Sequence, residues 1–292
     1  MANLDLRPLS LGEILDRSFA LYRQHFTLFI GIAAIPQLFV LLLSLAMILL
    51  GVSAPGIARA GSASGIAQSP AIIGTAIGVG VLLGLALIIV MTVAYLWMQG
   101  ATVSAVSDLY LGRPTTIGGA LRKTRSELGN LFGVGLLSGL VTGLAFILLI
   151  SPGIYVTCRL LVAVPVAVIE DLGARDTLER SFALTKENAG RAFLIILLYF
   201  ALAVGVTALF TFPGQFALIA VKNNPGLVLA IMAVNQILSS IGTVLITPVL
   251  LISSSVFYFD LRVRKEAFDL QMLMNPQGSL GPAASGIPSP LA

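Results

Sequence analysis

The chain has 292 residues, of which 57% are hydrophobic and only 10% are charged, and its mean hydropathy is +1.00. A soluble domain carries about 25% charged residues, so this composition excludes a water-soluble globule and predicts an all-α integral membrane protein. The net charge of +4 comes from basic residues that flank apolar segments. We therefore expect anionic lipid headgroups as partners and no nucleic acid.

The first predicted element is an amphipathic helix that begins at Ser10. Ser10 and Glu13 have the spacing of a capping box, in which each side chain satisfies a backbone amide at a helix start. Apolar residues then recur at helical spacing with charged residues opposite them. We expect this helix to lie in the membrane interface with its apolar face among the acyl chains. The same pattern recurs at residues 117–128 and 178–189.

Six segments are apolar over a length close to the roughly 20 residues that a spanning helix needs. They are residues 26–50, 71–98, 131–150, 153–169, 192–212 and 227–259. The fourth is the shortest and contains Arg159. The fold class is therefore a polytopic bundle of six transmembrane helices with three interfacial amphipathic helices.

The distribution of Lys and Arg predicts the orientation of the bundle. Three precede the first span, four lie between spans two and three, four between spans four and five, and three follow span six. The opposite loops contain only Arg59 and Lys222. Because basic loops stay on the cytoplasmic side, we expect a multi-pass protein of a bacterial inner membrane with both termini in the cytoplasm.

An internal repeat accompanies this arrangement. Residues 15–21 (LDRSFAL) reappear as residues 178–184 (LERSFAL) with one conservative change. We expect an integral membrane domain over residues 1–270, built from three similar units at 9–114, 115–173 and 174–270, each with an amphipathic helix followed by two spans. The remaining residues, 271–292, are rich in Pro, Gly and Ser, and we expect a disordered cytoplasmic tail.

The side chains that most enzymes need are scarce. The chain has one histidine, His25, and one cysteine, Cys158. A metal site made of several His or Cys side chains is therefore excluded, and so is an internal disulfide. Neither a phosphate-binding Walker sequence nor Gly-x-Ser-x-Gly occurs. We predict no catalytic residues, no cofactor and no metal, hence a non-enzymatic protein.

Two polar spots within the spans are candidates for ligand or lipid contact. Arg159 lies seven residues after Pro152, about 10 Å along a helix. It could hold a substrate anion, a lipid phosphate or a partner carboxylate. Alternatively, it could extend to the outer headgroups or donate to backbone carbonyls freed by Pro152 or Pro165. Asn235 and Gln236 form the second spot, and such residues also form hydrogen bonds between helices.

Basic side chains on the amphipathic helices form a third candidate site, a surface for anionic lipid or for a cytosolic partner. They are Arg17, Arg122, Lys123, Arg125, Arg180 and Lys186. In the third span, Gly135, Gly139 and Gly143 recur every four residues, which predicts close helix packing within the chain or between copies.

Several short motifs resemble a bacterial family named for the membrane domain of glycerophosphoryl diester phosphodiesterases. The motifs lie at residues 9–19 with 22–23, at 152–155 with Arg159, at 180–182 with 184–185, and at 258–270 (YFDLRVRKEAFDL). In the phosphodiesterases that name the family, hydrolysis belongs to a separate soluble domain with essential His and acidic residues. The resemblance therefore implies a stand-alone membrane module without catalytic residues.

The hypothesis that these observations favour is an integral membrane module that organises or regulates membrane partners or lipids. The alternative is a transporter or lipid-handling protein with a polar site around Arg159, Asn235 and Gln236. The oligomeric state is left open by the sequence.

Overall fold

The computed structural model describes residues 8–49, 70–221 and 224–266, and their regular structure is α-helical throughout. The all-α fold class is confirmed. Six helical segments within the described residues are long and apolar enough to cross a membrane, which confirms the predicted number. The predicted tail, residues 271–292, lies outside the described residues.

The helices follow one another in an order that alternates amphipathic and apolar segments. The amphipathic helices are α1 (Leu11–Gln24), α5 (Ile117–Arg125) and α9 (Ala174–Thr185). The apolar helices are α2 (Phe26–Leu49), α4 (Pro70–Tyr110), α6 (Leu128–Leu148), α7 (Ile150–Arg159), α8 (Ala163–Glu170), α10 (Ala189–Ala220) and α11 (Pro225–Glu266).

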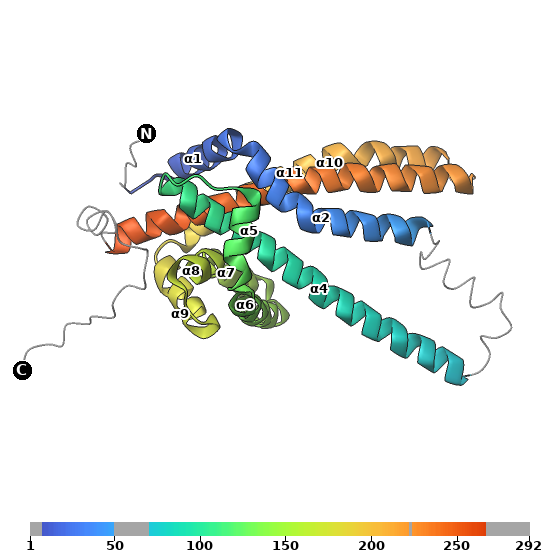
Figure 1. Ribbon diagram of the computed structural model, residues 1–292, viewed down its shortest axis with the longest axis horizontal. Helices are drawn as coiled ribbons and strands as arrows, with labels where there is room; N and C mark the ends of the chain where they lie inside the picture. The colour runs from blue at the N-terminus through green and yellow to red at the C-terminus, as the bar shows by residue number, and fades with distance from the viewer. Residues whose placement is uncertain (1–7, 50–69, 222–223, 267–292) are drawn as a thin grey trace, which may run out of the picture.

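The long helices and the short helices occupy different ends of the molecule (Figure 1). Helices α2, α4, α10 and α11 run along this axis, and their apolar portions extend to the right of the view. Helix α6 is seen nearly end-on, so it does not run parallel to them. At the left lie α1, α8, α9 and the last turns of α11, with α5 beside them. We call this region, together with the last turns of α4, the charged end.

Three predicted spans are longer in the structure, and one is broken. The fifth span, predicted at residues 192–212, becomes α10 (Ala189–Ala220). Helix α4 continues twelve residues past Met98 to Tyr110, and α11 continues to Glu266. The fourth span is divided into α7 and α8, which are separated at residues 160–162. Pro165 accounts for the break, because it has no amide to donate to Leu161 and its ring would clash with that carbonyl in a continuous helix.

The amphipathic helices pack against protein on part of the face that was expected to enter lipid. The predicted capping box of α1 is present, since Ser10 N donates to Glu13 Oε2 at 2.7 Å and Glu13 N to Ser10 Oγ at 3.3 Å. Ser18 of α1, Thr124 of α5 and Ser181 of α9 are fully buried. Small hydroxyl side chains at these places allow close approach of the next helix, as the contact of Thr124 with Gly100 of α4 illustrates.

A buried cluster around Asp260 joins the start of α1 to α10 and α11. The carboxylate of Asp260 is fully buried and accepts from Leu9 N at 2.6 Å, Arg191 Nη1 at 2.8 Å and Arg264 Nε at 3.0 Å. Arg191 and Arg264 also donate to the carbonyl oxygen of Leu9, at 2.7 and 2.5 Å. We call these four residues the Asp260 cluster. It connects parts of the chain that are 251 residues apart.

Asp260→Asn should destabilise the protein strongly. The substitution leaves Arg191 and Arg264 without a compensating charge, and breaking a buried ion pair costs about 3–5 kcal/mol. We expect a markedly lower unfolding temperature in detergent, measured by scanning fluorimetry.

The matched control is Asp16→Asn, at an exposed position on α1, which should leave the unfolding temperature nearly unchanged. Equal unfolding temperatures for the two variants would contradict a structural role for the Asp260 cluster.

Candidate functional site at the charged end

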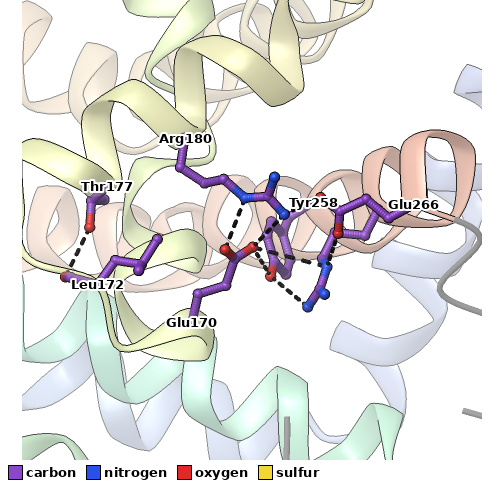
Figure 2. A network of polar contacts seen from close by, with 7 residues as sticks. Glu170, Leu172, Thr177, Arg180, Tyr258 and Glu266 are labelled. Atoms are coloured by element: carbon purple, nitrogen blue, oxygen red, sulfur yellow. Dashed lines mark hydrogen bonds and ion pairs between the residues drawn. The ribbon is translucent and has the colours of Figure 1, made fainter. Parts of the chain in front are cut away.

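A second buried cluster connects α8, α9 and α11 (Figure 2). Glu170 ends α8, and its carboxylate accepts from Arg180 Nε at 2.9 Å and from the hydroxyl of Tyr258 at 2.8 Å. Glu266 accepts from Arg262 Nε at 2.9 Å and also pairs with Arg180. These five residues form the Glu170 cluster. Its two arginines and two glutamates neutralise one another, which allows burial of the charges.

Arg180 was predicted to belong to the exposed basic surface, and the structure places it inside the Glu170 cluster instead. Burial by itself would lower the pKa of Arg180, but the hydrogen bonds and charges of Glu170 and Glu266 outweigh it and raise the pKa above its ordinary value. Arg180 therefore remains positively charged, and its ion pairs connect α9 to α8 and α11. Arg17 is also engaged, because it hydrogen-bonds to Tyr110 at the end of α4.

The other predicted basic residues do reach the surface. Arg122, Lys123 and Arg125 are exposed on α5, and Lys186 is exposed just after α9. Lys123 donates to Asp108 Oδ1 of α4 at 2.9 Å. The opposite face of α5 is anchored through the buried residues Ala120 and Thr124. Helix α5 thus presents Arg122 and Arg125 from a fixed position.

Arg159 lies at the broken span, where side chains and a carbonyl of α9 and Tyr155 of α7 hold its guanidinium. Its Nε donates to Thr185 Oγ1 at 3.0 Å, and its terminal nitrogens donate to the Tyr155 hydroxyl and to the carbonyl oxygen of Phe182. The guanidinium carbon also lies 5.5 Å from the ring centroid of Tyr155 and 5.1 Å from that of Phe182, close enough for cation–π attraction. The carbonyl that accepts from Arg159 belongs to Phe182 of α9 and is not one that Pro152 or Pro165 frees.

The backbone of Arg159 makes the same connection. In a continuous helix its carbonyl oxygen would accept from the amide of Ala163, which donates to Leu160 instead. The freed carbonyl accepts from Ser181 Oγ at 2.8 Å and Thr185 Oγ1 at 3.0 Å. A carbonyl inside an apolar bundle needs such a partner, so the hydroxyls of α9 stabilise the break.

Asn235 and Gln236 are not brought together with Arg159. Lys265 of α11 donates to the carbonyl of Ala183, next to Phe182, so Arg159 lies near the C-terminal end of α11. Asn235 precedes Lys265 by thirty residues, about 45 Å along a helix. Asn235 packs on Gly214 of α10, and its Oδ1 is buried without a hydrogen-bond partner. A single polar site containing both residues is not formed.

A cleft that was not predicted from the sequence lies between α4, α6 and α8, with a volume of about 480 Å³. Tyr95, Gln99 and Ser138 give it a polar part, and the buried Oγ of Ser138 has no hydrogen-bond partner. The adjoining glycine face of α6 is only partly packed: Gly135 contacts Leu96, while Gly139 and Gly143 have open space beside them. Of the three glycines, only Gly135 is closely packed against another helix of the chain.

The geometry offers no metal centre in the part of the chain that it covers. Among residues 8–49, 70–221 and 224–266, no three His, Cys, Asp or Glu side chains come together as metal ligands would. His25 caps the end of α1 through its backbone amide.

Glu127, between α5 and α6, carries a buried oxygen, Oε2, that has no hydrogen-bond partner. Burial raises the pKa of this carboxyl above its ordinary value of 4.5, and the charge of Asp171 raises it further, while Lys123 opposes the shift. When folding raises the pKa of a carboxyl, the unfolded chain loses this proton at a lower pH than the folded protein does. Above that pH, ionisation favours the unfolded state and lowers the free energy of unfolding. Stability should therefore fall as the pH rises from the ordinary pKa to the folded one.

Glu127→Gln should raise the unfolding temperature at pH 7 and leave it unchanged near pH 4, where both states of the wild-type carboxyl are mostly protonated. Glu187→Gln, at an exposed position, is the matched control. A lower unfolding temperature for Glu127→Gln at pH 7 would mean that the carboxylate stabilises the N-terminus of α6, and would contradict the prediction.

Comparison with known proteins finds a resemblance for the C-terminal half of the chain. Residues 136–277 match the family model described as the membrane domain of glycerophosphoryl diester phosphodiesterase. No curated protein sequence and no solved structure matches the chain. The match begins within α6, so the motif at residues 9–19 lies outside it. Over residues 136–277, which include the Glu170 cluster, the resemblance to this membrane-domain family is confirmed.

Proposed function

We propose that this protein is a non-enzymatic membrane module that organises or regulates lipids or partner proteins at the cytoplasmic face of a bacterial inner membrane. In this proposal both termini and the charged end lie in the cytoplasm. The observation that carries it is the position of α5, which holds Arg122 and Arg125 exposed at the charged end while its other face is buried.

Rigid attachment of α5 supports a binding role. Trp97 of α4 donates its indole N–H to the carbonyl of Leu121 at 2.9 Å, and Thr124 packs against Gly100. Cations on a helix that cannot move away lose little conformational freedom when they meet an anionic surface. Each Lys or Arg near an anionic membrane contributes about 1 kcal/mol of attraction, so a few fixed cations suffice for enrichment of acidic lipids.

Among the residues that the structure describes, no ion pair involves Arg122 or Arg125, whereas Lys123 pairs with Asp108. The arginines of the two clusters, Arg180, Arg191, Arg262 and Arg264, all pair with carboxylates that are buried or partly buried. Anionic headgroups are therefore the partner that we favour for Arg122 and Arg125, with an acidic segment of a protein as the other outcome.

Reversing two charges on α5 tests the proposal. Arg122→Glu with Arg125→Glu should reduce the enrichment of phosphatidylglycerol around the protein in mixed-lipid nanodiscs, measured by mass spectrometry of the retained lipid. Lys123 is left unchanged because its ion pair with Asp108 holds α5 to α4.

The control is Arg23→Glu with Arg175→Glu, which changes the net charge equally at exposed positions on α1 and α9. The proposal requires that the double substitution on α5 lower the enrichment of phosphatidylglycerol more than the control does. Unchanged lipid enrichment together with loss of a co-purifying protein would transfer the role to a protein partner. If the double substitution on α5 changed neither lipid enrichment nor a co-purifying protein, the proposal would be refuted.

The lipid-handling alternative retains one specific observation in its favour. Within the described residues no carboxylate lies within 4 Å of the Arg159 guanidinium, which is bound by neutral groups and two aromatic rings. A cation in such surroundings attracts an anion from the lipid phase. The exposed ring of Tyr155 places this region at the surface of the bundle.

For this alternative, Arg159→Gln should lower the amount of acidic lipid retained in detergent while the unfolding temperature falls only modestly, since Gln keeps a donor for α9. The measurement is lipid mass spectrometry of the purified variant. Retention equal to the wild type would leave Arg159 with a structural role only.

A further inference from the structure

A small polar cavity lies at the charged end between α4, α5 and α8. Its volume is about 240 Å³. Helix α4 contributes Ser104, Ser107 and Asp108, which share one face because residues three and four apart are neighbours on a helix. Arg113, after α4, and Lys123, on α5, complete the polar lining, and apolar residues of α8 close the cavity.

Ser104 shows that the cavity has unused hydrogen-bonding capacity. Its side chain is buried, with 1% of its surface exposed, yet its Oγ has no hydrogen-bond partner within the protein. Leaving a buried hydroxyl unsatisfied costs about 1–3 kcal/mol, so a group that fills this place gains a partner already oriented. A cavity of this size with hydroxyl and charged groups in its lining has room for water, which a ligand would displace.

The charges around the cavity favour an anion. Two cations, Arg113 and Lys123, line it against one carboxylate, Asp108. Lys123 Nζ donates to Asp108 Oδ1 at 2.9 Å, and the Lys123 side chain is still half exposed. An ammonium group has three donors, so the ion pair leaves others for a ligand. Asp108 thus orients Lys123, and the lining keeps a net charge of +1.

We propose that this cavity binds a phosphoryl group. Lys123 and Arg113 would supply charge-assisted hydrogen bonds to its oxygens, and the hydroxyls of Ser104 and Ser107 would donate from the α4 side. The site is distinct from the exposed face formed by Arg122 and Arg125 and does not depend on it. The phosphoryl group can belong to a lipid headgroup or to a small soluble molecule.

Protection of Lys123 from an amine-reactive reagent tests the proposal on the full chain in maltoside micelles, which contain no phosphate. Inorganic phosphate is one probe and added phosphatidylglycerol is the other, at constant ionic strength. Peptide mass spectrometry then gives the labelling of each lysine. We expect a probe to slow labelling of Lys123 and not of Lys186, which is exposed on the same molecule and serves as the internal control.

Two variants connect the protection to the cavity. Arg113→Gln should weaken the binding of the protecting probe about tenfold, the effect of losing one hydrogen bond from a charged group. Ser104→Ala should also weaken it, because the substitution removes the hydroxyl without adding volume at this buried position. The control is Ser255→Ala, a buried serine of α11 whose hydroxyl is bonded to the Leu251 carbonyl, and it should leave protection unchanged.

Each outcome is decisive. Protection by inorganic phosphate that Arg113→Gln weakens assigns a soluble phosphorylated ligand, and protection by phosphatidylglycerol alone assigns a lipid headgroup. Equal protection of Lys123 and Lys186, or protection that Arg113→Gln and Ser104→Ala leave unchanged, overturns the proposal. So does the absence of protection by either probe. None of these results depends on Arg122 or Arg125, so the proposed function can fail or hold independently.

Discussion

The packing of the charged end depends on the burial of charge along the last turns of α11. Tyr258, Arg262 and Glu266 recur every four residues and join α8 and α9, while Asp260 and Arg264 are offset by two residues and join α1 and α10. Two residues correspond to about 200° of rotation on a helix, so the two clusters lie on opposite sides of α11. Because an unpaired buried charge is costly, each partner helix must be in place at once.

The broken fourth span has a comparable effect on α9. Pro165 prevents a continuous helix, and the freed carbonyl of Arg159 is satisfied by Ser181 and Thr185. The same helix carries Arg180 into the Glu170 cluster. Helix α9 is therefore fixed by a backbone defect on one side and by ion pairs on the other. This explains why its inner face carries small hydroxyl residues where a lipid-facing helix would carry large apolar ones.

These constraints divide the basic residues into two groups with different roles. Arginines that face α11 serve the architecture, whereas the cations of α5 are attached to α4 mainly through apolar packing, an indole hydrogen bond and one exposed ion pair. That difference leaves Arg122 and Arg125 available for an external surface. It also leaves the cavity beside Asp108 with serines on α4, where the hydroxyl of Ser104 has no partner inside the protein.

The sequence alone determined the features that depend on neighbouring residues: six apolar spans, three amphipathic helices and the capping box at Ser10. Helical periodicity and hydropathy are local properties, and they can be read without knowledge of packing. The family motif at residues 258–270 was visible too, but its chemistry was not. Only the tertiary structure decided that Arg180 pairs with Glu170 and Glu266, that Asp260 accepts a hydrogen bond from Leu9, and that Arg159 and Asn235 lie far apart. Each of these features depends on which residues, distant in sequence, are buried next to one another. The pattern of hydrophobic residues along the chain does not specify that pairing.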